Sequence, residues 1–390
     1  MSLVRGREGF VRVARKRDGC WWLLDAKGRP WFLRAVHGVQ QGLQAEEGHG
    51  EEGDPLTRLR SWGFNALGVS DAPITRAGVP YLGLVGFAET AVKLTAPGVR
   101  LPDVFAPEWS ERAATRAVWR CASARNDSDL VGWVTDETLQ WGQGSTDGRP
   151  TLLQHCLSFE PSTAAYHAAW EFVLALHGGR FEAVARAWET PLPNKEVVRE
   201  LTRREQGIST RGYVRDHARW TREFARLYFS VAAAAIRAVD PNHLVLGCRF
   251  RGDEGAEVLG ACTYPAVDVA MPAWRDLPAP GSAMGAQPIL AGEVHWADET
   301  FKRPALEGRD RRLTSLELML RRARAQLERT ARHPAVAGYL WSQWEDGPHE
   351  QPPFARGLVR GNRREARENT ELLALFNARA ESLHVRRLPE

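Results

Sequence analysis

Short apolar runs alternate with longer amphipathic segments along most of the chain. Eight runs rich in Val, Leu and Phe can be recognised, and several end in polar or aromatic residues. They cover 31–37, 64–70, 81–87, 130–136, 243–249, 267–273, 288–294 and 336–343. Such runs are typical of strands buried on both faces, and the intervening segments have helical spacing. The pattern predicts eight βα units, the number in a (β/α)8 TIM barrel.

Two further segments add to this barrel. Residues 8–30 contain turn signals at Asp18-Gly19 and Lys27-Gly28, flanked by apolar residues, and predict an antiparallel N-terminal β-hairpin. Residues 140–240 are too many for a simple βα connection and contain helical spacing. Because this helical insertion follows strand 4, we expect it over the C-terminal face, where it would wall or cover the site. We interpret 1–390 as one α/β domain.

Composition and charge narrow the function classes. Only five of the 52 basic residues are lysines, and the arginines are interspersed with glutamates on predicted helix faces. This favours solvated helix surface over a nucleic-acid-binding stripe. Five widely spaced cysteines without a Cys-x-x-Cys pair argue against a disulfide framework. The first twenty residues lack an apolar stretch long enough for a signal peptide or membrane span, so we expect a cytoplasmic protein, with a trimmed leader as the alternative.

Motifs for metal or cofactor chemistry are missing from the sequence. The first predicted strand offers only His37 rather than a His-x-His pair, and Glu293 with His295 is too small a set for a metal. There is no Gly-x-Ser-x-Gly elbow, and no Gly-rich phosphate loop followed by Lys-Ser or Lys-Thr. We therefore expect neither a metal nor a cofactor.

A carboxylate at a strand end is the first candidate for chemistry. Glu293 is the last residue of the apolar run PILAGE. A carboxylate at this position is either a functional group that faces a cavity or a strand-end residue paired with an arginine. We favour the functional interpretation, because charged residues are seldom fully buried without partners. Cleavage of a glycosidic bond requires two carboxyl groups roughly 5 to 9.5 Å apart. The strand ends of one barrel can hold both.

Seven stretches, taken in order, resemble beta-agarase-like and related retaining glycoside hydrolases. They are GRPWFLRAVHGV, LRSWGFNALGVSD, PDVFAPEW, VGWVTDETLQWG, RAVDPNHLVLGCRF, ILAGEVHW and HPAVAGYLWSQWED, and together they span most of the chain. The resemblance implies a barrel that hydrolyses a β-linked oligosaccharide or glycoside with retention. It also implies that Glu293, at the end of the seventh strand, is the nucleophile.

The fourth strand departs from the family pattern. There the family has Asp-Asn-Glu, whose Glu is the acid/base, whereas this chain has Asp136, Glu137 and Thr138. A threonine hydroxyl cannot donate a proton as a carboxylic acid does. Glu137, only about 3.3 Å away along the strand, is the first replacement, and Asp136 is the second. The alternative for Glu137 is an ion pair with a nearby arginine, in which it carries no proton to the substrate. Thr138 favours a second hypothesis, a catalytically impaired barrel that acts as a carbohydrate-binding or regulatory protein.

Other residues at predicted strand ends are candidates for sugar binding. His37 stands where relatives often carry Asn, and Trp274 stands where such barrels usually place a tyrosine. Tryptophans at strand ends either stack on a pyranose ring or pack in the core. Arg249 and Asp346 either bind hydroxyls, hold Glu293 ionised or pair with other charges. The predicted substrate-binding set is His37, Asn65, Trp141, Arg249, Trp274, His295, Trp296, Trp341, Trp344 and Asp346.

Overall fold

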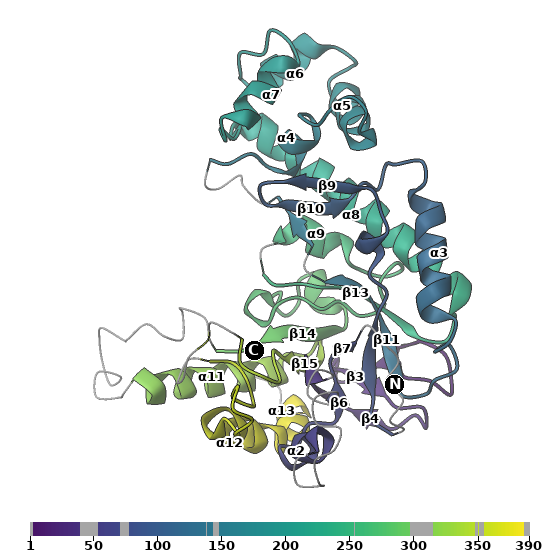
Figure 1. Cartoon of the computed structure of the whole chain (residues 1–390), viewed down its shortest axis with the longest axis vertical. Helices are drawn as coiled ribbons and strands as arrows, with labels where there is room; N and C mark the ends of the chain where they lie inside the picture. The colour runs from purple at the N-terminus through teal and green to yellow at the C-terminus, as the bar shows by residue number, and fades with distance from the viewer. Residues whose placement is uncertain are drawn as a thin grey trace.

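The structure is a computed structural model with an α/β fold. It describes residues 3–39, 54–70, 78–137, 139–142, 148–252, 254–296, 315–347, 350 and 355–385. Figure 1 shows the parallel strands in the lower body of the molecule and a group of helices, α4–α7, at the top of the view. Among the described residues, no helix is both long and apolar enough to span a bilayer.

The N-terminal region is a four-stranded antiparallel sheet. Its turns contain Gly19 and Gly28, which both have positive φ angles that glycine adopts without steric cost. The β3 strand is buried along its whole length, so the sheet packs against the body. The strands, in spatial order, are β1 (Leu3–Arg5), β2 (Arg12–Arg15), β3 (Trp21–Leu24) and β4 (Pro30–Trp31).

Seven of the eight predicted runs contain strands, and these form two parallel four-stranded sheets. The first has the order β13 (Leu244–Arg249), β11 (Leu130–Glu137), β8 (Tyr81–Leu84), β7 (Val69–Ser70). The second has the order β14 (Ile289–Val294), β15 (Val336–Trp341), β5 (Leu33–Val36), β6 (Ala66–Leu67). The regular pairing therefore gives two sheets rather than the single closed ring that the sequence predicts.

The predicted sixth strand, 267–273, makes only isolated parallel bridges. Met271 bridges Arg249 on one side, while Ala270 and Ala273 bridge Ile289 and Gly292 of β14 on the other. The sequence explains the irregularity, because Pro272 lacks the N–H that a regular ladder requires. The segment nevertheless lies between β13 and β14, and it connects the two parallel sheets.

Helices cover the strands and connect them. In α8 the buried residues Tyr213, His217, Trp220, Phe224 and Tyr228 recur three or four positions apart, the spacing of an apolar helix face. This helix packs against α3 and α9, and α11 packs against α12 and α13. The helices are α2 (Pro55–Ser61), α3 (Trp109–Cys121), α8 (Arg211–Val239), α9 (Gly255–Ala261), α11 (Ser315–Arg332), α12 (Arg367–Asn377) and α13 (Ala380–Val385), with 3-10 turns η2 (Phe87–Glu89), η3 (Trp274–Asp276) and η4 (Met284–Ala286).

The segment 140–240 is not helical from its start. It begins with β12 (Gln140–Trp141), which joins β9 (Lys93–Ala96) and β10 (Val99–Pro102) in a small antiparallel sheet. The helices α4–α7 follow and lie at the far end of α8 from the parallel strands (Figure 1). Their bounds are α4 (Leu152–Cys156), α5 (Ala164–Leu176), α6 (Phe181–Ala187) and α7 (Glu196–Arg203).

Candidate active site

One arginine joins the two carboxylates that the sequence selects. Arg249 Nε donates a hydrogen bond to Glu137 Oε1 at 2.5 Å, and Arg249 Nη1 donates to Glu293 Oε2. Glu137 and Arg249 are in register at the ends of the paired strands β11 and β13, and Glu293 lies in β14. The Arg249 side chain is only 4% exposed. The fold therefore brings Glu137 and Glu293 to two nitrogens of one buried guanidinium.

Several groups around Glu293 keep it ionised. Burial alone would raise the pKa of this carboxyl, but Arg249, His295 and Arg251 oppose that effect, as does a hydrogen bond from Ser342. The net pKa is below the ordinary value for glutamate. Arg251 Nε lies 3.9 Å from Glu293 Oε1. A carboxylate held in its charged form is suited to nucleophilic attack.

The backbone of Glu293 is in an unusual conformation. Its φ angle is +51°, in the left-handed region that few residues other than glycine adopt. Such positions persist where the surrounding structure holds them, and they are concentrated at functional sites. The neighbouring parallel ladder between β14 and β15 is irregular at the same place, between Ala291 and Val294. The conformation supports a functional role for Glu293.

His37 completes the polar group. It follows β5, and its Nδ1 lies 4.0 Å from Glu137 Oε1, without a hydrogen bond to any described residue. Burial lowers the pKa of His37 to about 4, with a further contribution from the cation of Arg249. The imidazole is therefore neutral at pH 7 and remains able to donate or accept a hydrogen bond.

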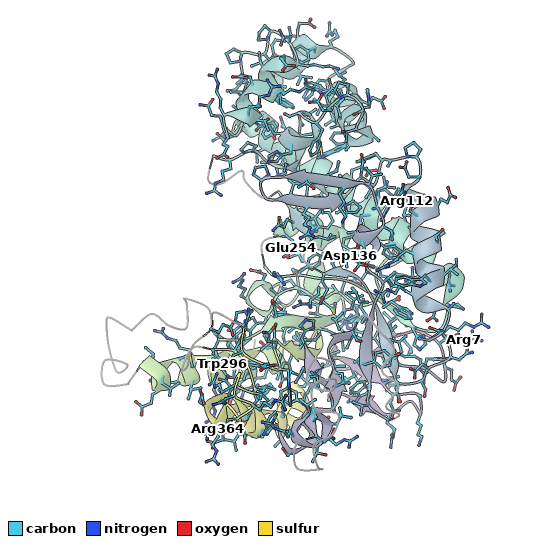
Figure 2. All side chains as sticks on the ribbon, viewed as in Figure 1. Arg7, Arg112, Asp136, Glu254, Trp296 and Arg364 are labelled. Atoms are coloured by element: carbon cyan, nitrogen blue, oxygen red, sulfur yellow. The ribbon has the colours of Figure 1, made fainter. Side chains whose placement is uncertain are left out.

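Asp136 is adjacent in sequence but lies in a different environment. It is buried and accepts hydrogen bonds from the Ala88 N–H at 3.0 Å and from the Tyr228 hydroxyl at 2.5 Å. Burial raises the pKa of Asp136 to about 7 against these two hydrogen bonds. In Figure 2 Asp136 lies below the β9–β10 hairpin. Thr138, which follows this pair in sequence, lies outside the described residues.

A cavity of about 250 Å³ lies beside these carboxylates. Both Asp136 and Glu137 border it, whereas Glu293 does not. Its outer wall comes from β9 and β10, not from the helices α4–α7 that we expected to cover the site. The lining residues are Leu84, Gly86, Ala88, Glu89, Lys93, Arg100, Leu101, Asp136, Glu137 and Leu139.

The predicted sugar-stacking tryptophans are core residues in this structure. Trp141 packs among Phe224, Tyr228 and Phe229. The Trp296 and Trp341 rings contact each other at 4.4 Å between centroids. The indole faces are covered by protein rather than presented to a cleft. All five tryptophans of the predicted substrate-binding set are buried: Trp141, Trp274, Trp296, Trp341 and Trp344.

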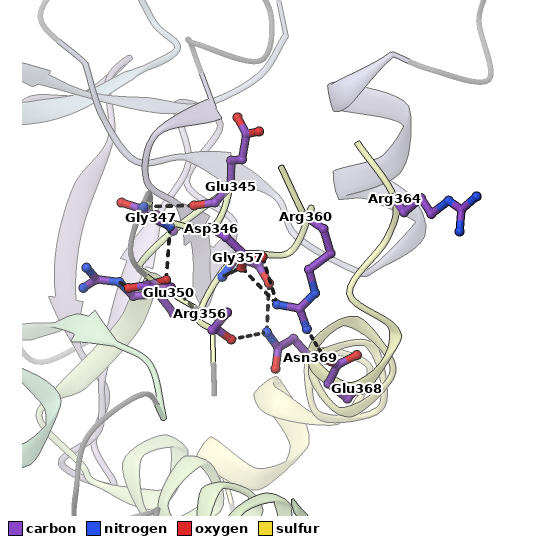
Figure 3. Close-up of polar contacts among 12 residues, drawn as sticks. Glu345, Asp346, Gly347, Glu350, Arg356, Gly357, Arg360, Arg364, Glu368 and Asn369 are labelled. Atoms are coloured by element: carbon purple, nitrogen blue, oxygen red, sulfur yellow. Dashed lines mark hydrogen bonds and ion pairs between the residues drawn. The ribbon is translucent and has the colours of Figure 1, made fainter. Parts of the chain in front are cut away.

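Two other predicted binding residues have structural contacts elsewhere. Asn65 accepts a hydrogen bond from Arg34 N–H and donates to the Phe32 carbonyl, so it braces the start of β5, away from the strand ends that carry the site. Asp346 accepts hydrogen bonds from Arg360 Nη1 and from the Gly357 N–H, both at 2.9 Å. Figure 3 shows that this pair anchors a loop near Glu368. Asp346 is therefore held by an ion pair, the alternative that the sequence left open.

Some residues at the site were not predicted. Arg251 is two positions beyond Arg249, where the alternation of a strand indicates the same face. Ser342 directly follows β15, so its position at a strand end was a usable signal. Tyr228, Lys93 and Arg100 come from a helix and a hairpin, and nothing in their local sequence indicates the cavity. The described residues contain no group of three or more His, Cys, Asp or Glu arranged to hold a metal ion.

Comparison with known proteins shows that the chain is similar to agarases. No family model matches the chain. The chain is 27% identical over 213 residues to Beta-agarase A of Vibrio sp. (strain JT0107), and this match covers 50% of the chain but only 21% of the agarase. A solved structure of PfGH50B superposes with a TM-score of 0.71 at 18% identity, covering 98% of this chain and 68% of that one. A solved exo-beta-agarase gives a TM-score of 0.71 at 16% identity, covering 98% and 66%.

The chain has the fold of these proteins. The superpositions span nearly all of it, including the two parallel sheets and the inserted helices. The sequence match with the Vibrio agarase is an independent observation that points in the same direction, although it covers only about a fifth of that protein.

Proposed function

We propose that this protein is a glycoside hydrolase that cleaves a β-linked oligosaccharide with retention of configuration. The observation that carries the proposal is the shared contact of Glu137 and Glu293 with Arg249, since a retaining site needs two carboxyl groups close together. The likeness to agarases in fold and in part of the sequence supports a sugar substrate. No metal or cofactor enters the proposed mechanism.

The proposal includes a closed (β/α)8 barrel as the scaffold. Only Gly68 separates β6 from β7, and these strands pair with β5 on one side and β8 on the other. The bridges of 267–273 to β13 and β14 support closure at the opposite side. On this interpretation the carboxylates are at the C-terminal ends of the strands, where barrel enzymes have their sites.

In the first step, the Glu293 carboxylate attacks the anomeric carbon and forms a covalent bond to the sugar. The glycosidic oxygen leaves with a proton that Glu137 supplies. In the second step, Glu137 removes a proton from water, and this water releases the sugar from Glu293. Both carboxyl groups return to their starting protonation states. His37, neutral and beside Glu137, is placed to hydrogen-bond a sugar hydroxyl.

Arg249 sets a condition on this mechanism. Its Nε uses Glu137 as an acceptor, whereas the acid step needs Glu137 to carry a proton. Substrate binding must therefore break the hydrogen bond between Arg249 Nε and Glu137. The hydrogen bond from Arg249 Nη1 to Glu293 can remain. Asp136, which borders the same cavity, is the second candidate acid. Its buried position and its contacts with Ala88 and Tyr228 fit a supporting role better.

Activated aryl β-glycosides test the proposal, because a good leaving group needs little acid assistance. We expect slow turnover by the native chain, with the first-formed sugar keeping its anomeric configuration by NMR. Glu293→Gln should abolish turnover. Glu137→Gln should reduce turnover most with poor leaving groups, whose departure needs the acid. With activated leaving groups the slow step becomes hydrolysis of the glycosyl-enzyme, so added azide should raise turnover and release the glycosyl azide. Turnover that survives Glu293→Gln would refute the proposal.

A second function is favoured by the same arginine. A protein whose two carboxylates are both tied to Arg249, and whose sequence has Thr138 at the family's acid position, could bind sugars without cleaving them. This function predicts saturable binding of an oligosaccharide by calorimetry with no release of aryl leaving groups. Thr138→Glu would then create hydrolysis, whereas an already active enzyme would gain little.

We also propose that the protein works in the cytoplasm. All five cysteines are buried and none forms a disulfide, which fits a reducing compartment. Detection of the native protein in the periplasmic or extracellular fraction of its host would contradict this.

A further inference from the structure

Two cations on the β9–β10 hairpin border the cavity. Lys93 and Arg100 both line it, as do Asp136 and Glu137 at the end of β11. Arg100 is directly opposite Thr95 in the antiparallel register, and Lys93 is two residues from Thr95. Since alternate residues of a strand share a face, the two cations are diagonal neighbours on one face. Long side chains at such positions reach a common ligand.

The carboxylates that border the cavity have bonding partners, whereas its two cations have no ion pair among the described residues. Glu89 pairs with Arg116, and Glu137 pairs with Arg249. Asp136 accepts hydrogen bonds from Ala88 and Tyr228, as described above. In the part of the chain that the structure describes, Lys93 and Arg100 form no ion pair with any carboxylate. The uncompensated charge that borders the cavity is therefore positive.

The size of the cavity limits what these cations can bind. A volume of about 250 Å³ corresponds to about eight water molecules, which suits one sugar unit rather than a long chain segment. Glu137 at its inner edge places such a unit next to the bond that the proposed mechanism cleaves. Apolar lining from Leu84, Leu101 and Leu139 offers contact for the carbon side of a sugar ring.

We propose that this cavity is a subsite for an anionic sugar unit, whose carboxylate or sulfate group is bound by Lys93 and Arg100. The inference rests on the proposed function in assuming a sugar substrate, but its test needs no turnover. Both side chains are exposed, so each charge pair alone is weak, about two- to fivefold in affinity. Together with contacts inside the cavity they would set a preference for charged over neutral sugars.

Binding of three small glycosides to the full chain tests this subsite. The probes are methyl β-D-galactoside, its uronic acid and its 6-sulfate, measured by ligand-observed NMR titration. We expect one or both anionic probes to bind about three- to tenfold tighter than the neutral one, and to lose this advantage between about 20 and 500 mM NaCl. The carboxylate and sulfate probes, compared directly, show which anion the subsite takes.

Three double variants separate charge from structure. Lys93→Gln with Arg100→Gln should remove the preference, whereas Lys93→Arg with Arg100→Lys should keep it. The control, Lys27→Gln with Arg215→Gln, removes the same net charge from exposed positions in the β3–β4 turn and in α8, and should also keep the preference. Equal binding of all three probes, binding of none, or a preference that survives the first variant would overturn the inference. Loss of hydrolysis in Glu293→Gln with an unchanged anion preference would leave it standing.

Discussion

The hydroxyl of Tyr228 in α8 donates a hydrogen bond to Oδ2 of Asp136 at 2.5 Å, and both residues are buried. Asp136 directly precedes Glu137 at the end of β11, so this hydrogen bond ties the crossover helix to the strand that presents the proposed acid. A second hydrogen bond, from the Ala88 N–H, ties the same carboxyl to the turn after β8. Asp136 therefore holds the end of the strand in place, which fits the supporting role proposed for it.

The first prediction concerns the pH dependence of stability. The pKa of Asp136 is about 7 in the folded protein because of burial, whereas an aspartate in an unfolded chain titrates near about 3.9. Between these values the folded protein holds a proton that the unfolded chain has released. This group therefore lowers the free energy of unfolding as the pH rises from about 4 to about 7.

Asp136→Asn should remove that decrease, because an amide does not titrate. Urea unfolding at several pH values between about 4 and 7 gives the slope of the free energy of unfolding against pH. A constant loss of stability in the variant does not change this slope. Asp25→Asn is the control, since Asp25 is a loop residue whose pKa is lowered, not raised. Equal slopes in the native chain and in Asp136→Asn would show that Asp136 ionises normally.

The second prediction concerns Arg249. Replacing it with glutamine leaves Glu137 and Glu293 close together without their shared cation, and breaking a buried ion pair from one side typically costs about 3–5 kcal/mol. Arg251→Gln, at a side chain that is 54% exposed, should change stability by less than about 0.5 kcal/mol.

A double-mutant cycle measures the coupling. Removing one carboxylate together with the cation, in Arg249→Gln with Glu137→Gln, should cost less than the sum of the two single changes. Chemical denaturation gives the free energy of unfolding of the native chain, of the two single variants and of the double variant. Simple additivity would mean that the Arg249–Glu137 contact contributes nothing.

The third prediction concerns the charge of His37. Burial and then Arg249 hold its pKa at about 4, so the folded protein binds fewer protons than the unfolded chain between about pH 4 and 6.5. This group makes stability rise with pH in that window. NMR titration of the ring should find the transition near pH 4, and His37→Asn should leave the pH limbs of kcat/KM unchanged. A ring titrating near pH 6.5 would contradict the proposed environment.

The fourth prediction concerns glycine in the strands. A Cβ at Gly338 of β15 would lie 2.3 Å from Leu33 Cβ in the neighbouring β5, so Gly338→Ala must push the two strands apart. We expect a loss of about 1–3 kcal/mol or more.

Gly260 in α9 offers a matched control, because nothing lies within 4 Å of an added Cβ there. Gly260→Ala should stabilise by about 0.5–1 kcal/mol, through the lower backbone entropy of the unfolded chain. Thermal unfolding compares the two variants directly. A Gly338→Ala protein as stable as the native chain would mean that β5 and β15 are farther apart than described.

The sequence by itself determined where seven of the eight predicted parallel strands lie, and it selected the first catalytic candidate. Buried parallel strands are local apolar runs, so their periodicity is visible without knowing what they pack against. Glu293 stood out for the same reason, as a charge at the end of such a run. The turns at Gly19 and Gly28 are also set locally, because each depends on the conformational freedom of one residue.

Only the tertiary structure decided which side chains meet. Arg249 could have paired with either carboxylate or with neither, and its contact with both follows from the register of β11 and β13 and from the bridging segment at 267–273. Tryptophans at strand ends have the same sequence pattern whether they face a sugar or the core, and here packing buries them. Lys93 and Arg100 line the cavity from a hairpin in the connection between β8 and α3. Contacts between distant segments carry no local signal, because their energy depends on the whole fold.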